Sequence, residues 1–241
     1  MPGTDPQAVR LLCLPHAGGG AAWFGNWASA LAGVDVLPVQ PPGRETRLAE
    51  VPFSSMSDLI AALGPAVLPL CRTRFALFGH SMGAHVAFEL TRWLRDRGES
   101  LPLCLILAGA RAPHLPPRDP PLWGLDDTAL LASIEILYGS HFEPDMHELV
   151  SLTLPTLRAD LKVVESSAHQ PAAPLPVPML VLAGHADQGV SLAEARQWQR
   201  HTSEEFEFKV LQGQHFFPVT QREATLACVA RALAKHAATV A

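Results

Sequence analysis

Short apolar segments alternate along this chain with longer segments in which apolar residues recur at helical spacing. Most of the short segments are apolar throughout, which is typical of parallel strands covered on both faces. Strands are expected at residues 9–14, 35–39, 75–78, 103–107, 179–182 and 206–211, and helices at 22–32, 58–70, 82–97, 193–201 and 222–238. This alternation predicts an α/β fold with a mostly parallel, doubly wound sheet.

Residues 111–178 interrupt the alternation. The segment has prolines clustered at both ends, no convincing strand, and helix-like patterns around 127–137 and 146–161. We interpret it as a helical lid inserted between two strands of a single domain that spans residues 1–241, with the proline clusters acting as hinges. Plain loops at those prolines are the simpler alternative.

Composition narrows the class of protein. The 241 residues are 48% hydrophobic, enough for one large core, and the net charge of −5 offers no basic surface for nucleic acid. The N-terminal residues do not resemble a secretory signal and no apolar run reaches about 18 residues, so a cytoplasmic protein without a membrane segment is expected. Four widely spaced cysteines predict buried thiols, with neither a disulfide framework nor a metal site. They are Cys13, Cys71, Cys104 and Cys228.

A nucleophile motif stands between a predicted strand and a predicted helix. The sequence GHSMG at residues 79–83 matches G-x-S-x-G, in the strand-turn-helix context that a nucleophile elbow requires. Its glycines permit a sharp turn that exposes Ser81 at the start of the helix. The alternative is that Ser81 only caps the helix.

A serine nucleophile needs a base and an orienting carboxylate, which in this fold follow the serine in the order acid, then histidine. Asp187 follows the predicted strand 179–182 and is our candidate acid, while Asp160, inside the insertion, stays open as a competitor. His215 follows the last predicted strand on a glycine-containing loop and is our candidate base. His185 is a weaker alternative.

An oxyanion hole needs two backbone donors. The amide of Met82, next after the nucleophile, is one candidate, and the loop PHAGGG at residues 15–20, after the first strand, is placed to supply the other. A glycine-rich loop could instead hold a phosphate, but neither nucleotide-binding fingerprint is present.

These residues together resemble the type II thioesterases that accompany polyketide and nonribosomal peptide synthetases, over nearly the whole chain. The segments that carry the resemblance are LPHAGG (14–19), QPPGRE (40–45), GHSMGA (79–84), GARAPH (109–114), LRAD (157–160) and GQHFF (213–217). Two residues depart from the family pattern: Gln214 replaces a frequent glycine, and His85 replaces a small or apolar residue and is expected to affect packing behind the nucleophile.

The resemblance implies an α/β-hydrolase that removes acyl groups from the phosphopantetheine arm of acyl or peptidyl carrier proteins, without a metal or cofactor of its own. It assigns the triad to Ser81, Asp187 and His215 and the oxyanion amides to Ala17 and Met82. A monomer is expected, with an acyl pocket under the lid. Packing inside the lid is the open alternative for the insertion residues expected to line that pocket, which are Trp123, Leu130, Ile134, Phe142 and Leu149.

Three other functions stay open. A general carboxylesterase or lipase would use the same triad, and a non-catalytic scaffold would only bind a carrier protein. A releasing domain cut from a larger synthetase is the third, although the start at Met1 without a linker favours a free-standing protein.

Overall fold

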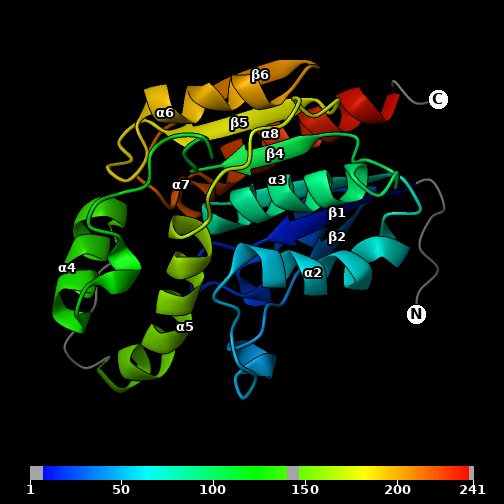
Figure 1. The fold of residues 1–241 in the computed structure, drawn as a ribbon. Coiled ribbons are helices and arrows are strands. Elements are labelled where there is room, and N and C mark those ends of the chain that lie inside the picture. Colours follow the sequence, from blue (N-terminus) through cyan, green and yellow to red (C-terminus); the bar gives the residue numbers. More distant parts are fainter. Residues whose placement is uncertain (1–7, 140–146, 239–241) are drawn as a thin grey trace.

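The computed structural model describes residues 8–139 and 147–238. Its centre is a six-stranded sheet in the order β2-β1-β3-β4-β5-β6, and every neighbouring pair of strands is parallel (Figure 1). The prediction of a mostly parallel α/β sheet is therefore confirmed. The strands are β1 (Val9–Leu14), β2 (Val34–Pro38), β3 (Phe75–His80), β4 (Leu105–Ala108), β5 (Met179–Gly184) and β6 (Phe206–Leu211).

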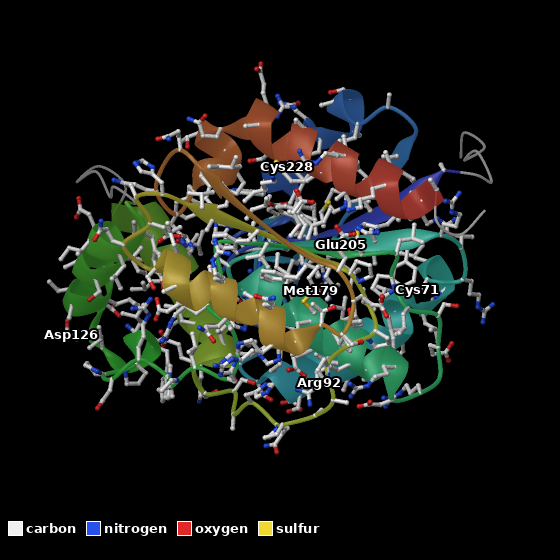
Figure 2. The ribbon with its side chains drawn as sticks, turned by 90° about the horizontal axis from the view of Figure 1, so that it is seen from above. Cys71, Arg92, Asp126, Met179, Glu205 and Cys228 are labelled. Carbon is white, nitrogen blue, oxygen red and sulfur yellow. The ribbon has the colours of Figure 1, made fainter. Side chains whose placement is uncertain are left out.

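Helices cover both faces of the sheet, which explains why the central strands are apolar throughout. Along β1, Leu12 and Leu14 enter one hydrophobic core, while Leu11 and Cys13 enter another on the opposite face. The first core lies under α2 (Met56–Val67), α3 (Met82–Arg95) and α6 (Leu192–Arg196). The second lies under α1 (Trp27–Ala30), α7 (Phe217–Thr220) and α8 (Arg222–Ala238). Figure 2 shows the two layers, with Arg92 on one side of the sheet and Cys228 on the other.

Some predicted helices are shorter or divided. The helix expected at 22–32 is two short ones, η1 (Ala21–Phe24) and α1, because Gly25 and Asn26 interrupt it with residues of low helix propensity. Single-turn 3-10 helices continue α2 as η3 (Leu68–Leu70) and α6 as η6 (Gln197–His201), and η2 (Glu45–Arg47) follows β2. By contrast, the bounds of β1, β6 and α8 are those predicted.

The segment between β4 and β5 contains η4 (Leu122–Gly124), α4 (Asp127–Tyr138) and α5 (His147–Glu165). Helices α4 and α5 project from one end of the sheet (left in Figure 1). They share a small hydrophobic cluster, the lid cluster, which includes Leu122, Leu130, Ile134, Leu154 and Leu161. Asp126 caps the start of α4 by accepting from the Ala129 amide, and Gly139 ends it in the left-handed conformation.

Candidate active site

Ser81 occupies a strained turn between β3 and α3. Its φ is +56°, a region that non-glycine residues seldom adopt, and its backbone amide donates to the Ala108 carbonyl at 2.8 Å. The turn closes tightly because a Cβ on Gly79 would overlap the Gly83 backbone, and one on Gly83 would overlap the Leu14 carbonyl. The Ser81 side chain forms no capping hydrogen bond with α3. Ser81 is thus the N-cap residue of α3 by position, but its side chain takes no part in capping.

The candidate acid and base meet above the sheet edge. Nδ1 of His215, from the loop after β6, lies 2.8 Å from Oδ2 of Asp187, from the loop after β5, and both side chains are buried. Oδ1 of Asp187 accepts the Gly189 and Val190 amides at 2.9 and 3.1 Å, which fixes the carboxylate. Ser81 and His215 line the same cavity. The competitor His185 is exposed and accepts the Gly213 amide, so it holds the loop before His215 instead.

Asp160, the competing carboxylate, has a different set of partners. It lies on α5, buried, and forms a bidentate ion pair with Arg44 at 2.5 and 2.9 Å. It also accepts the Gly18 amide at 2.7 Å, and Arg44 donates to the Gly19 carbonyl. Burial raises the pKa of the Asp160 carboxyl, while Arg44 and the Gly18 amide lower it. Asp160 thus anchors the loop after β1 to the insertion and does not orient His215.

The two candidate oxyanion donors border the serine. Ala17 and Met82 line the cavity together with Ser81. Within the described part of the chain, neither backbone amide has a hydrogen-bond partner, whereas the neighbouring Gly18 and Gly19 amides are bonded. Two free donors beside a strained serine can receive negative charge that develops on a substrate oxygen.

A cavity of about 590 Å³ extends from Ser81 between α3, the segment after β4 and the end of α5. From the insertion it is lined by Tyr138, Leu161, Val164 and Glu165, together with the segment that follows α5. For Trp123, Leu130 and Ile134 the sequence prediction was wrong, because none of them lines the cavity. Leu130 and Ile134 are buried in the lid cluster and Trp123 packs against it, while the side chains of Phe142 and Leu149 lie outside the described residues.

Sequence reasoning also missed the position of His85. It lines the cavity one helical turn beyond Ser81, with Trp198 5.6 Å away between ring centroids, and does not sit behind the nucleophile. Burial and the nearby Arg111 lower its pKa to about 4, so the ring is neutral at pH 7. The i, i+4 spacing from Ser81 was the available signal, because residues four apart share one face of a helix.

An aromatic cluster packs behind the base. His80 stacks on Trp23 at 5.3 Å and lies 5.0 Å from His215 between ring centroids, and His16 and Phe216 complete the cluster. Burial is the main reason that the pKa values of His80 and His16 are lowered, and the neighbouring His215 adds to the effect. The pKa of His16 falls to about 3. Both rings are therefore neutral, and they pack behind His215 without adding a charge.

Within residues 8–139 and 147–238, no three side chains of His, Cys, Asp or Glu are arranged to hold a metal ion. No helix in these ranges is both long and apolar enough to cross a bilayer. The four cysteines are free and buried, as their spacing predicted.

A doubly wound parallel sheet with a strained serine after β3 and an Asp–His pair after β5 and β6 defines the chain as an α/β-hydrolase. A family model described as "Thioesterase domain" matches residues 9–233. The chain belongs to this thioesterase family and is an enzyme that hydrolyses thioesters.

Known relatives agree with this assignment. Thioesterase PikA5 of Streptomyces venezuelae is 44% identical over 88% of this chain and 76% of its own length. The chain is similar in structure to the RedJ thioesterase from the prodiginine pathway of Streptomyces coelicolor, with a TM-score of 0.87, 37% identity and coverage of 95% and 88%. It is also similar to the type II thioesterase BorB from the borrelidin cluster, with a TM-score of 0.83, 36% identity and coverage of 95% and 93%. The resemblance to type II thioesterases is thereby confirmed.

Proposed function

We propose that this chain hydrolyses acyl groups held as thioesters on the phosphopantetheine arm of acyl or peptidyl carrier proteins, with Ser81 as nucleophile, His215 as base and Asp187 as orienting acid. The observation that carries the proposal is the 2.8 Å contact between His215 and Asp187 at the cavity that also exposes the strained Ser81. It needs no metal or cofactor.

In the acylation step, the Ser81 oxygen attacks the thioester carbonyl and His215 takes the serine proton. Asp187 accepts from Nδ1 of His215, which leaves Nε2 as the nitrogen that takes the serine proton, and the carboxylate stabilises the imidazolium. The Ala17 and Met82 amides stabilise the oxyanion, and collapse of the intermediate expels the thiol, with the proton supplied by His215.

Deacylation then uses the same groups. His215 takes a proton from a water molecule that attacks the acyl-serine, and the same two amides hold the second oxyanion. The proton returns to the Ser81 oxygen as the free acid departs.

Two observations support a carrier-bound substrate. RedJ and BorB, to which the chain is similar, come from the prodiginine biosynthetic pathway and the borrelidin biosynthetic cluster. The cavity of about 590 Å³ falls in the range of drug-sized ligand pockets, so it has room for acyl groups longer than acetyl. We also propose that the enzyme works as a monomer in the cytoplasm.

The test is to load one carrier protein with acetyl, hexanoyl and longer acyl groups and to follow acid release by intact-protein mass spectrometry. Wild type and a Ser29→Ala variant, altered at an exposed serine on α1, should unload the carrier. The rate of acid release by Ser81→Ala should be lower by several orders of magnitude, because the nucleophile is lost.

Hydrolysis of oxygen esters of the same acyl groups distinguishes a carrier thioesterase from a general esterase. If wild type cleaves those esters but leaves every loaded carrier intact, the carrier-thioesterase proposal fails. If neither substrate class is cleaved and no acyl-serine forms, the protein is a non-catalytic binder.

A further inference from the structure

Tyr138, the last residue of α4 and the one tyrosine of the sequence, lies directly against the candidate base. Its ring centroid is 4.4 Å from that of His215, with the ring planes tilted by 41°. Tyr138 also approaches the turn that holds the acid: a Cβ on Gly189 would overlap the tyrosine ring, and the Gly189 amide donates to Asp187. One side chain of the insertion thus packs on the loops of both acid and base.

The residue after Tyr138 makes a second close approach to the base loop. Gly139 has a φ of +70°, and a Cβ there would overlap the side-chain oxygen of Gln214, which immediately precedes His215. The C-terminal end of α4 is therefore seated on the loop that carries the base.

The aromatic face of Tyr138, and not its hydroxyl, makes this contact. Over the described residues the hydroxyl has no hydrogen-bond partner, and burial raises its pKa, so it stays neutral. A neutral ring over an Asp–His pair excludes water, and electrostatic interactions strengthen as water is excluded. It also restricts rotation of the imidazole, whose orientation decides whether proton transfer is possible.

We propose that Tyr138 is a positioning residue for hydrolysis: seated on His215, it keeps the imidazole directed at Asp187 and shielded from water, so the base is fully competent only while the end of α4 is in place. This inference rests on the proposed roles of Ser81, Asp187 and His215. Tyr138 also lines the acyl cavity, so the test must separate positioning from a simple effect on pocket shape.

The kinetic test compares Tyr138→Phe and Tyr138→Ala with wild type on carriers loaded with acetyl, hexanoyl and octanoyl groups. The phenylalanine variant should stay close to wild type, because it keeps the ring. For the alanine variant we expect kcat to fall roughly ten- to hundredfold, in the range that small misplacements of catalytic groups produce. The factor should be the same for every acyl length, with KM little changed.

Leu137→Ala is the matched control, because Leu137 and Tyr138 are neighbours on α4 that both pack against the lid cluster, while the Tyr138 ring also lies against His215. An equal loss of kcat in this variant would mean that weakening of the lid explains the result, and would overturn the proposal. A loss in Tyr138→Ala that is confined to long acyl groups would overturn it too, because it would identify a pocket wall.

A second measurement does not depend on turnover. Replacement of the single tyrosine by 3-fluorotyrosine gives one ¹⁹F resonance, recorded in Ser81→Ala and in Ser81→Ala/His215→Asn under the same conditions. We expect its chemical shift to differ between the two proteins, because the tyrosine ring lies against the His215 ring in only one of them. A resonance that is the same with and without His215 overturns the inference. If the resonance responds to His215 but the wild-type enzyme unloads no carrier, the proposed function is refuted and the contact stands.

Discussion

At the scale of single residues, Arg44 and Asp160 form an ion pair beside the candidate oxyanion loop. Both side chains are buried, and together they hold the Gly18 amide and the Gly19 carbonyl beside the candidate oxyanion donors. Removing one member of such a pair costs more than the pair itself contributes, because the remaining charge is left buried without compensation.

We therefore expect Asp160→Ala to lower the free energy of unfolding by about 3–5 kcal/mol. Urea denaturation followed by circular dichroism measures this loss. Asp127→Ala is the control, because Asp127 pairs with Arg158 on the exposed side of the insertion, where such pairs are worth about 0–1 kcal/mol. An equal loss of unfolding free energy in Asp160→Ala and Asp127→Ala would contradict this expectation. The double variant Arg44→Met/Asp160→Leu removes both charges and should recover much of the stability that Asp160→Ala loses.

At the scale of elements, α3 shows how packing can reverse an intrinsic helix propensity. Gly83 lies in the first turn of this helix, where alanine is ordinarily favoured by about 1 kcal/mol. Here a Cβ would overlap the Leu14 carbonyl oxygen and crowd the Pro15 carbonyl at the start of the candidate oxyanion loop.

Gly83→Ala should therefore destabilise the protein, by about 1–3 kcal/mol if overpacking is the only cost. Hydrolysis should fall as well, because the Ala17 amide would move relative to Ser81. Thermal unfolding and turnover on one acyl carrier check both expectations. The control Gly124→Ala, where the nearest atom to an added Cβ is 3.8 Å away, should change neither. A Gly83→Ala enzyme as stable and active as wild type would show that the elbow can relax.

Helix α4 is expected to open locally more often than the central strands. Its buried residues, Leu130 and Ile134, belong to the small lid cluster and to neither core of the sheet. Elements with few buried contacts open locally at lower free energy than core strands. Hydrogen exchange should accordingly be faster for the α4 amides than for those of β3 and β4, and equal protection would mean that the insertion unfolds only with the whole domain.

For the whole molecule, buried histidines predict how stability varies with pH. Burial lowers the pKa of His16 to about 3 and the pKa values of His85 and His201 to about 4, from an ordinary value of 6.5. Below pH 6.5 the unfolded chain binds protons at these positions and the folded chain does not. The contribution of these three histidines to the free energy of unfolding is therefore fully present above pH 6.5 and is lost as the pH falls toward 4.

The melting temperature should consequently be lower at pH 5.5 than at pH 7.5. Glu89, Asp160 and Glu165 act in the opposite sense, because burial raises their pKa values, and they reduce the size of the effect. Calorimetry at matched ionic strength makes the comparison. His201→Gln should flatten the profile if the protein folds, and a melting temperature independent of pH over this range would contradict the argument.

The sequence by itself determined the parallel sheet, the elbow at Ser81, and the order of the candidate acid and base. These are local or periodic properties: apolar runs predict covered strands, and a glycine pair around a serine permits one kind of turn. Asp187 and His215 could be selected because each follows a strand, and the carboxyl ends of parallel strands share one edge of the sheet.

Only the tertiary structure decided which residues line the cavity and what Asp160 contacts. Leu130 and Ile134 could not be distinguished from lining residues, because an apolar side chain fits a lid cluster as well as a pocket wall. Asp160 meets Gly18 across 142 positions of sequence, and Tyr138 meets His215 across the whole β5–β6 region. Such contacts depend on how the insertion docks onto the sheet edge, and neither periodicity nor motif spacing encodes that arrangement.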